Sequence, residues 1–462
     1  MIEKIVLIGA GSAMFTQGVV SDLIRSKMEV ELALVDIDPQ ALEAAYQLSG
    51  KMIAASKAPI SLRASIERRE LLPGATVVIT TIGVGGRRAW EQDVFIPRKY
   101  GLHYAVGDTA GPGGTSRALR MIPPMVAIAQ DVLDLAPEAL FFNYANPMAP
   151  VCRAVHTATG AKVIGLCIGT FETWHYLAEA LGAPPEALSF SAGGINHLTW
   201  FYDVRLDGQE AMTRLKLIAE QRLESLGKTL RAGKIPHCGS PYDSSMDFPF
   251  AWQCLLWFGA YPAPQDRHVT EFFPQLFRGG EYYGKTLGVN EFTFEGTIAS
   301  GDQIYAEMRR DALASNPLTE AYFEKMEGEQ EQVVEIIRSI RENQYRRVFA
   351  NTPNVGQVPN LPLGAVVETP AVVDSNGIHA ITQAPLPKAA AGLLATRFAW
   401  VDLVVEAALE GSRTKFIDAL ILDGGVKSPD MAVALADELL IAQRIYLPNF
   451  KETAFHGRAI HR

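Results

Sequence analysis

Residues 4–12 read KIVLIGAGS, and this short segment sets the fold class expected for the N-terminal half. A β-branched apolar run leads into a glycine turn at Gly9 and Gly11, and a helical pattern covers residues 16–26. A strand, a glycine turn and a helix N-terminus form a pyrophosphate site, because free backbone N–H groups and the positive end of the helix dipole face the anion. The third position of the G-x-G-x-x-G pattern is Met14, so the match is incomplete.

The next apolar run, residues 30–35, ends at Asp36. A carboxylate here would receive the ribose hydroxyls of NAD and repel the additional phosphate of NADP. Helix and strand keep alternating, with a helical pattern at 39–56 and a buried strand at 76–81. We predict an α/β fold with an N-terminal Rossmann-like, doubly wound parallel sheet, and a doubly wound domain that binds no nucleotide is the alternative. The predicted NAD-binding residues are Gly9, Gly11, Ser12, Asp36, Gly83 and Asn143.

Composition bounds the classes of function. The 462 residues, 48% hydrophobic and 20% charged, can bury a core larger than one domain normally holds. The net charge of -9 argues against a nucleic-acid-binding protein. No apolar run reaches the roughly 20 residues of a membrane span, and the first residues predict a strand rather than a signal peptide. We therefore expect a cytoplasmic protein without membrane or nucleic-acid partners.

The pattern changes in the second half, where longer amphipathic stretches follow residue 205. We predict an NAD-binding domain at 1–195 and, at 196–462, a C-terminal mixed α+β domain for substrate, metal and oligomerisation. Apolar stripes at helical spacing within 327–349 and 389–409 are expected to be core. The proline-containing segment 354–370 is expected to be an ordered loop or an edge segment.

A glycine-rich segment covers residues 106–115, and we predict a loop there with a helix over 116–135. Such a loop is either a flexible connector or a lid on a site. Because it carries Asp108, with Arg117 just beyond it, the site interpretation is favoured.

Apolar runs between residues 140 and 201 end in polar or metal-capable side chains, among them Asn146, Cys167, Asn196 and His197. Side chains at the carboxyl ends of strands in an α/β sheet point into the ligand crevice. If Cys167 and His197 share a metal, they leave coordination positions open for substrate, and a thiolate with an imidazole indicates zinc or iron. The alternative is a buried apolar cysteine and an unrelated core histidine.

A second group of polar residues, Gln-Asp-Arg-His at 265–268, is followed by Glu271. A charge cluster is commonly a solvated loop. Its apolar flanks make a cleft position the competing interpretation.

Taken together and in order, the motifs resemble glycoside hydrolase family 4, a family of NAD- and divalent-metal-dependent glycosidases. The resemblance covers nearly the whole chain, and it is closest to the branch that contains α-galacturonidases, with α-glucosidases and α-galactosidases more distant. The motifs are G-x-G-S at residues 9–12, G-D-T at 107–109 with G-P-G-G at 111–114, N-Y-A-N-P-M at 143–148, the Cys167 region, G-I-N-H at 194–197, D-R-H at 266–268, and N-L-P at 360–362 with V-E at 367–368.

The resemblance implies a mechanism in which NAD removes a hydride from C3 of the sugar, which acidifies the proton on C2. A base removes this proton while the metal stabilises the resulting charge; the aglycone leaves, water adds at C1 and the hydride returns. This differs from the usual scheme of two carboxylates. By matched motif, Cys167 and His197 hold the metal, Mn²⁺ or another divalent ion, and Asp266 is the C2 base.

The remaining roles are also implied by the resemblance or by charge. Asn146 and Asn196 would hydrogen-bond sugar hydroxyls, and Asp108 is a proton donor or a substrate contact. Charge alone suggests that Arg117, Arg267 and His268 receive an anionic group of the substrate.

One position departs from the family pattern. Ile168 follows Cys167, where many members carry His or Asp, and it can neither protonate nor ligate. The sugar and the general acid therefore stay open.

The expected activity is hydrolysis of an α-linked hexoside or an acidic glycoside such as a hexuronide by a homodimer or homotetramer. The alternatives are a conventional NAD-dependent sugar or hydroxy-acid dehydrogenase and a nucleotide-sensing protein without catalysis.

Overall fold

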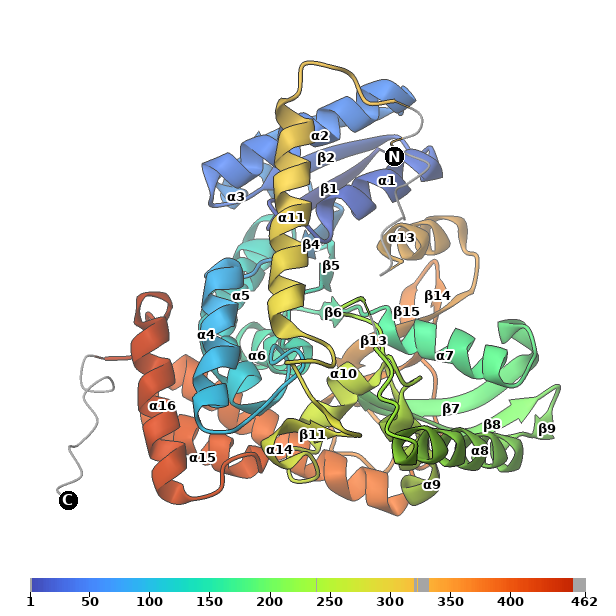
Figure 1. The fold of residues 1–462 in the computed structure, drawn as a ribbon. Helices are drawn as coiled ribbons and strands as arrows, with labels where there is room; N and C mark the ends of the chain where they lie inside the picture. The colour runs from blue at the N-terminus through green and yellow to red at the C-terminus, as the bar shows by residue number, and fades with distance from the viewer. Residues whose placement is uncertain (1, 238, 320–321, 323–331, 452–462) are drawn as a thin grey trace.

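A computed structural model describes residues 2–237, 239–319, 322 and 332–451 (Figure 1). The strands are β1 (Glu3–Ile8), β2 (Val30–Val35), β3 (Ile60–Ser65), β4 (Val77–Thr80), β5 (Leu140–Asn143), β6 (Val163–Gly165), β7 (Leu188–Ile195), β8 (Leu198–Leu206), β9 (Gln209–Glu210), β10 (Tyr261–Ala263), β11 (Glu281–Tyr282), β12 (Lys285–Thr286), β13 (Arg346–Pro353), β14 (Val366–Asp374) and β15 (Gly377–Ala380). The helices are α1 (Thr16–Ser26), α2 (Pro39–Ser56), α3 (Arg68–Leu71), α4 (Gly86–Lys99), α5 (Gly111–Leu135), α6 (Met148–Thr159), α7 (Gly169–Ala180), α8 (Met212–Arg231), α9 (Pro249–Phe258), α10 (Asp266–Val269), α11 (Phe294–Leu313), α13 (Val333–Glu342), α14 (Lys388–Glu410), α15 (Arg413–Asp423) and α16 (Pro429–Gln443).

The N-terminal strands form a parallel sheet in the order β3-β2-β1-β4-β5-β6. This is the Rossmann order, in which the chain reverses direction across the sheet between β1 and β4. Strands β1, β2 and β4 are buried almost throughout, because helices cover both faces and their apolar runs have no face left for water. The predicted doubly wound parallel sheet is confirmed.

The sheet continues beyond β6 with antiparallel strands in the order β13-β14-β7-β8-β10. Two of these contacts join distant parts of the chain: Asn351 pairs with Gly165 of β6, and Glu368 pairs with Gly194 of β7. The predicted boundary between residues 195 and 196 falls in the tight turn between β7 and β8. Helix α11 also returns to the N-terminal half and packs on α2 (Figure 1).

The glycine-rich loop is shorter than expected. We predicted a helix from Ser116, and this boundary is wrong, because α5 already begins at Gly111. Proline at the start of the helix is favourable, since its missing N–H would be unpaired there in any case. A Cβ on Gly114 would lie 2.4 Å from the carbonyl carbon of Thr109, so glycine here allows the first helical turn to pack directly on the loop.

Two expectations in the C-terminal half need correction. The apolar residues of α13 are core as predicted, but a strand begins at Arg346, so Phe349 belongs to β13. Residues 327–331 of the predicted stripe lie outside the described residues. The segment 354–370 is not loop to its end, because Val366 starts β14 in the interior of the sheet. Pro370 fits there because β14 changes partner at this point, from β7 to β15. The predicted helix at 389–409 is confirmed as α14, which ends at Gly411 in a left-handed conformation.

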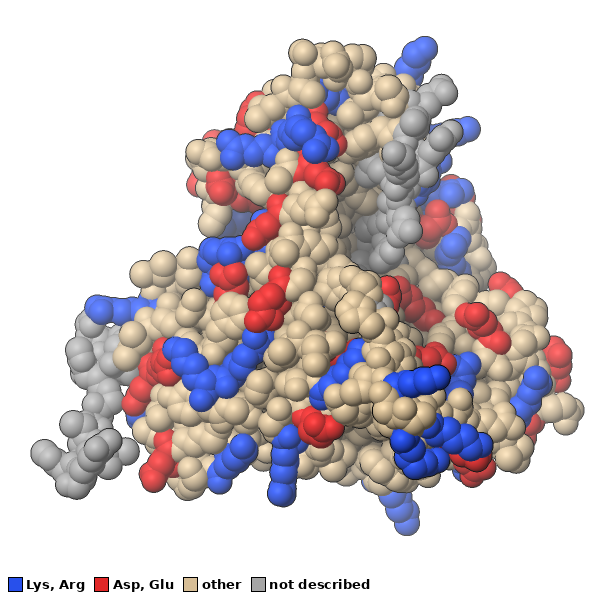
Figure 2. All heavy atoms as spheres, viewed as in Figure 1, with Lys and Arg blue, Asp and Glu red and all other residues tan. Residues whose placement is uncertain are grey.

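Among the described residues, none of the helices has the length and apolar character needed to cross a bilayer. Figure 2 shows Lys and Arg interspersed with Asp and Glu over the face in view.

Candidate active site

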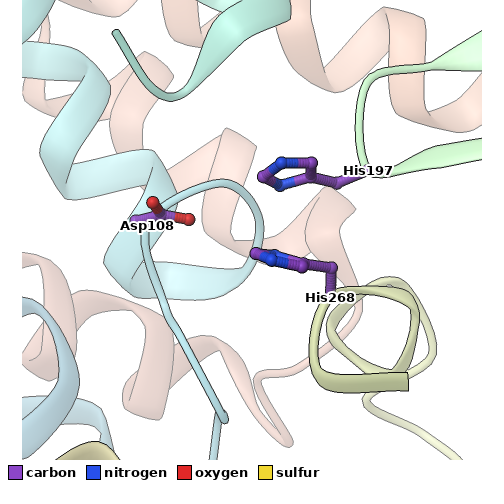
Figure 3. Close-up of side chains that lie close together, drawn as sticks. All are labelled: Asp108, His197 and His268. Atoms are coloured by element: carbon purple, nitrogen blue, oxygen red, sulfur yellow. The ribbon is translucent and has the colours of Figure 1, made fainter. Parts of the chain in front are cut away.

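Three ligand-type side chains from distant parts of the chain point toward one another (Figure 3). Asp108 lies on the loop before α5, His197 on the turn between β7 and β8, and His268 on α10. One ligand atom from each lies within 4.8 Å of the other two. This spacing allows a single divalent cation to contact all three.

A hydrogen-bond chain orients the imidazole of His197. Its Nδ1 lies 2.9 Å from the hydroxyl of Thr109, and that hydroxyl donates to Asp108 Oδ1 at 2.8 Å. A hydroxyl that donates to a carboxylate can accept from Nδ1–H, and Nε2 then keeps its lone pair. Nε2 lies 3.6 Å from the sulfur of Cys167. The structure therefore brings Cys167 and His197 together, with the lone pair of the histidine directed at the thiol.

Both histidines favour the neutral form that a metal ligand requires. Burial lowers the pKa of His197, although the carboxylates of Asp108 and Glu368 act in the opposite direction. Burial lowers the pKa of His268 well below its usual value, and repulsion between the two histidines when both are protonated, together with the charge of Arg267, adds to the effect. The two rings lie 3.9 Å apart between centroids, and Nδ1 of His268 has no hydrogen-bond partner among the described residues.

Two asparagines complete the polar lining. Asn146 Nδ2 donates to Asp108 Oδ2 at 3.2 Å, and Asn196 Nδ2 donates to Glu368 Oε1 at 3.2 Å. The Oδ1 atoms of both are buried and find no partner among the described residues. Buried polar atoms are normally paired, so these acceptors indicate a ligand with hydroxyl groups.

Glu368 holds Asn196 of this lining in place through hydrogen bonds, although the sequence suggested no role for it. Its Oε2 accepts from the hydroxyls of Thr170 and Thr199, each at 2.6 Å, and its Oε1 also accepts from Asn351 at 3.0 Å. The carboxylate is buried but fully hydrogen-bonded, so it fixes Asn196 next to His197. Thr109 is the other functional residue that was missed. Both residues stood in quoted motifs, but their partners are far away in sequence.

Two arginines lie near Asp108. Burial lowers the pKa of Arg267, while the charge of Asp108 acts against the shift. Burial and the charge of Arg120 lower the pKa of Arg117, and the charge of Asp108 again acts against the shift. Arg267 stacks over the ring of Tyr242 at 4.9 Å, and Arg117 Nε donates to the carbonyl of Asn146 at 3.0 Å. Both side chains are half-buried, and within the described part of the chain neither arginine forms an ion pair with a carboxylate.

Asp266 lies elsewhere, and the structure does not support it as a base at this cluster. Its carboxylate accepts from the N–H groups of Phe250 and Ala251 at 2.7 and 2.8 Å and from the hydroxyl of Tyr282 at 2.6 Å. It therefore holds the N-terminus of α9, where backbone N–H groups and the helix dipole stabilise a negative charge. Burial raises the pKa of Asp266 to about 6.

Glu271 holds the loop that carries Asp108. Its Oε1 accepts from the N–H groups of Val106 and Gly107, each at 2.7 Å. Burial raises the pKa of Glu271 to about 8, and the charge of Asp108 adds to the shift. The polar cluster at 265–271 is therefore a cleft and core feature rather than a solvated loop.

The glycine turn after β1 has the geometry of a nucleotide site. Gly9 adopts φ +95°, and a Cβ there would lie 2.7 Å from the backbone nitrogen of Ile82. The N–H of Gly11 donates to Asp36 Oδ2 at 2.8 Å. Gly83, after β4, faces open space. The turns after β1 and β4 thus flank the crevice where the sheet reverses direction, and Ser12 lies on the first of them.

Asn143 does not reach this crevice. It is completely buried, and its side chain bonds the hydroxyl of Thr80 and the backbone of Ala145. Its role in the structure is to shape the turn after β5, so the prediction that it contacts the cofactor is not supported.

Comparison with known proteins extends over both halves of the chain. A model described as Family 4 glycosyl hydrolase matches residues 4–183, and one described as Family 4 glycosyl hydrolase C-terminal domain matches residues 192–426. An alpha-glucosidase of Erwinia rhapontici is 31% identical, with 98% of this chain and 100% of the relative covered. An alpha-galacturonidase of Bacillus subtilis (strain 168) is also 31% identical, with 88% of this chain and 89% of the relative covered.

Solved structures share the architecture. LplD from Bacillus subtilis is 28% identical with a TM-score of 0.82, covering 95% of this chain and 100% of that chain. A 6-phospho-alpha-glucosidase from gut microorganisms, solved in complex with NAD and Mn²⁺, has a TM-score of 0.81 at 18% identity, and the match covers 98% of this chain and 100% of that chain. At this identity the likeness supports the fold alone. The full-length matches show that the chain belongs to glycosyl hydrolase family 4 and is a glycosidase.

Proposed function

We propose that this glycosidase cleaves an acidic glycoside and uses NAD together with a divalent cation such as Mn²⁺. Two contacts of His197 carry the proposal. Its Nε2 lies 3.6 Å from the sulfur of Cys167, and ligand-type atoms of Asp108 and His268 lie within 4.8 Å of a ring nitrogen of His197. A thiolate and an imidazole together suit a divalent transition metal.

The two cofactors would share one edge of the sheet. Cys167 follows β6 and Asn146 follows β5, while Gly9 follows β1 and Gly83 follows β4. Parallel strands bring their carboxyl ends to one side, so the nucleotide crevice and the cation cluster face the same space. When bound, NAD would accept and return a hydride, and the cation would act as a Lewis acid on sugar oxygens.

The side chains of this protein take the remaining roles. Asn146 and Asn196 hold sugar hydroxyls through their unpaired Oδ1 atoms. Asp108, next to both histidines, is the group that we assign to proton transfer. Thr109 keeps His197 in the tautomer that presents Nε2.

The acidic character of the substrate follows from the arginines. Arg267 is half-buried, and its Nε is buried without a hydrogen-bond partner among the described residues. A charged group that is partly removed from water is stabilised by an opposite charge beside it. A carboxylate or phosphate on the sugar would supply that charge to Arg267, with Arg117 behind Asn146.

A matched pair of substrates tests this proposal. Aryl galacturonide and aryl galactoside differ only in the carboxylate, and both are assayed with NAD, Mn²⁺ and a thiol reductant. Arg267→Gln should raise KM for the acidic substrate at least tenfold and leave the neutral one within about twofold, a loss of about 1.4 kcal/mol or more. Arg309→Gln, on the exposed surface of α11, is the control. Equal losses on both substrates would contradict recognition of an anion by Arg267.

The same assay separates the glycosidase from a dehydrogenase. NADH absorbance should not accumulate with aglycone release, because the hydride returns in each turnover. Steady accumulation in proportion to product would refute the proposed chemistry.

The compartment and the assembly are part of the proposal as well. A ligand thiol at Cys167 must stay reduced, which favours the cytoplasm. A homodimer or homotetramer remains our prediction, and light scattering of the purified protein tests it.

A further inference from the structure

An open cavity of about 1050 Å³ lies along α7, the helix that follows β6 (Figure 1). Ile168, the residue after Cys167, lines this cavity together with Glu172, His175 and Glu179. Residues three or four positions apart share one face of a helix, so this face of α7 forms one wall of the cavity. The cavity therefore starts at the residue next to the candidate metal ligand.

The first turn of α7 packs against the segment that leads into α10. A Cβ on Gly169 would lie 2.5 Å from Cβ of Pro264, and the hydroxyl of Thr173 donates to the carbonyl of Pro264 at 3.1 Å. Helix α10 carries Arg267 and His268. The start of α7 is therefore fixed beside the helix that contributes to the cation cluster.

The carboxyl group of Glu172 is accessible in this cavity. The residue is exposed, and within the described ranges of the chain its side chain forms neither a hydrogen bond nor an ion pair. The cavity walls remove part of the water around the carboxyl group, which raises the pKa of Glu172, while the charge of Arg267 opposes the shift and that of Asp243 adds to it. The carboxyl group therefore keeps its proton to a higher pH than a fully hydrated glutamate, as a proton donor requires.

The geometry of the helix turns Glu172 back toward Cys167. The N–H of Glu172 donates to the carbonyl of Ile168 at 3.0 Å, so one regular helical turn joins these two residues. Cα–Cβ bonds in a helix tilt toward its N-terminus, and Cβ atoms four residues apart lie about 5–6 Å from each other. The side chain of Glu172 thus leans over Ile168, whose hydrocarbon side chain cannot transfer a proton.

We propose that the leaving group of the glycoside occupies the cavity along α7 and that Glu172 protonates its oxygen. The inference rests on the proposed function, which assigns proton transfer at the cation cluster to Asp108 and leaves the leaving group without a donor. Phe171 and Tyr176 add aromatic surface to the cavity, which suits a ring-shaped leaving group such as a sugar or an aryl alcohol.

The protons and electrons balance over the two steps. In the elimination, the electron pair of the C2–H bond forms the C1–C2 double bond. The pair of the C1–O bond passes to the leaving oxygen, which takes the proton of Glu172. In the addition, water gives a hydroxyl group to C1 and a proton to the Glu172 carboxylate, and the base returns its proton to C2.

Substrates that differ only in the acidity of the leaving phenol test this role. Dinitrophenyl and phenyl galacturonides, with the matching galactosides and glucosides, are assayed with NAD, Mn²⁺ and a thiol reductant. Dinitrophenolate leaves without a proton, whereas phenolate needs one. Glu172→Gln should lower kcat/KM for the phenyl substrates that the wild type cleaves by about 10²–10⁴-fold, as is typical for loss of a general acid, and leave the dinitrophenyl substrates within about threefold.

A matched variant controls for the change of charge. Glu220→Gln removes an exposed carboxylate from α8 and should leave the rates on both leaving groups unchanged. Because Glu172 has no partner in the described ranges, Glu172→Gln should keep the melting temperature of the wild type, which circular dichroism checks. Equal losses on dinitrophenyl and phenyl substrates, or no loss on phenyl substrates, would overturn the inference.

Hydrolysis in D₂O tests the proposed function separately. Wild type and Glu172→Gln should both release sugar with deuterium at C2 from the dinitrophenyl substrate, because Glu172 does not act at that carbon. A product without deuterium at C2 would contradict the proposed chemistry at the sugar ring. The comparison of leaving groups would still decide whether Glu172 is the acid, because a poor leaving group needs a proton by either route.

Discussion

Thr109→Val tests how the imidazole of His197 is held. The substitution keeps the shape of a buried side chain and removes only its hydroxyl, which bonds His197 Nδ1 and Asp108 Oδ1. His197 then has no acceptor for Nδ1–H, and nothing fixes the tautomer that presents Nε2. We expect weaker binding of Mn²⁺ by a folded protein.

The size of the effect follows from the two bonds of 2.9 and 2.8 Å. A neutral hydrogen bond contributes about 0.5–1.5 kcal/mol and a bond to a carboxylate about 1.5–3 kcal/mol, so losing both costs about 2–4.5 kcal/mol. Removing the partner that orients a metal-bound histidine typically lowers metal affinity about 10–100-fold, or about 1.4–2.7 kcal/mol. The two ranges overlap at about 2–2.7 kcal/mol, and the predicted rise in the Kd for Mn²⁺ is one to two orders of magnitude.

The assay is a titration of metal-free protein with Mn²⁺, followed by the electron paramagnetic resonance signal of the free ion. Thr109→Ser keeps the hydroxyl and loses only a methyl group, so it should bind Mn²⁺ within about threefold of the wild type. Binding by the valine variant within twofold of the wild type would refute the reasoning about the tautomer. Equal weakening in both variants would assign the effect to packing of the methyl group.

Gly114→Ala should lower the melting temperature and the activity, because its Cβ would lie 2.4 Å from a backbone carbon of the loop. Gly392→Ala in α14 is the control, because its Cβ meets nothing within 4 Å, and it should stabilise the folded protein by about 0.5–1 kcal/mol. Glu271 has a pKa raised from 4.5 to about 8, so the stability it contributes is fully present below about pH 4.5 and is lost as the pH rises toward 8. Glu271→Gln removes this loss. The free energy of unfolding of the variant, relative to that of the wild type, should therefore increase between pH 5 and 8 by at most about 1.4 kcal/mol per pH unit. A difference that does not change with pH in urea unfolding would contradict this. Asp93→Ala leaves Arg120 buried without its partner at 2.5 Å, and it should lower the free energy of unfolding by about 3–5 kcal/mol in chemical unfolding. The double variant Asp93→Ala/Arg120→Met should recover much of that loss. No recovery would argue against an unpaired charge as the cause.

The parallel half of the sheet could be predicted from sequence because its signals are local. The helices at 16–26 and 39–56 have the predicted bounds, since their apolar periodicity and flanking strands lie within a few residues. The start of α5 could not be predicted in the same way. Gly111 to Gly114 look like a loop until the loop backbone that packs against them is known.

The approach of Cys167 to His197 was predictable, because both residues follow strands whose ends meet at one edge of the sheet. Their sulfur and Nε2 lie 3.6 Å apart, and their shared metal stays a prediction. Thr109 and Glu368 act through partners that the fold brings to them, and the sequence does not encode those contacts locally. Asp266 shows the converse, because a carboxylate in a charged motif turned out to hold a helix end.

The insertion of β13 and β14 between β6 and β7 constrains the order in which this protein can be completed. Strands β6 and β7 leave the ribosome more than a hundred residues before the pair that will separate them. Until then each exposes an open hydrogen-bonding edge, and such edges invite association with other chains. A nascent or truncated chain that ends before residue 346 would therefore lack Glu368 and also be prone to aggregate, so chaperone dependence should end once the last strand pair is synthesised.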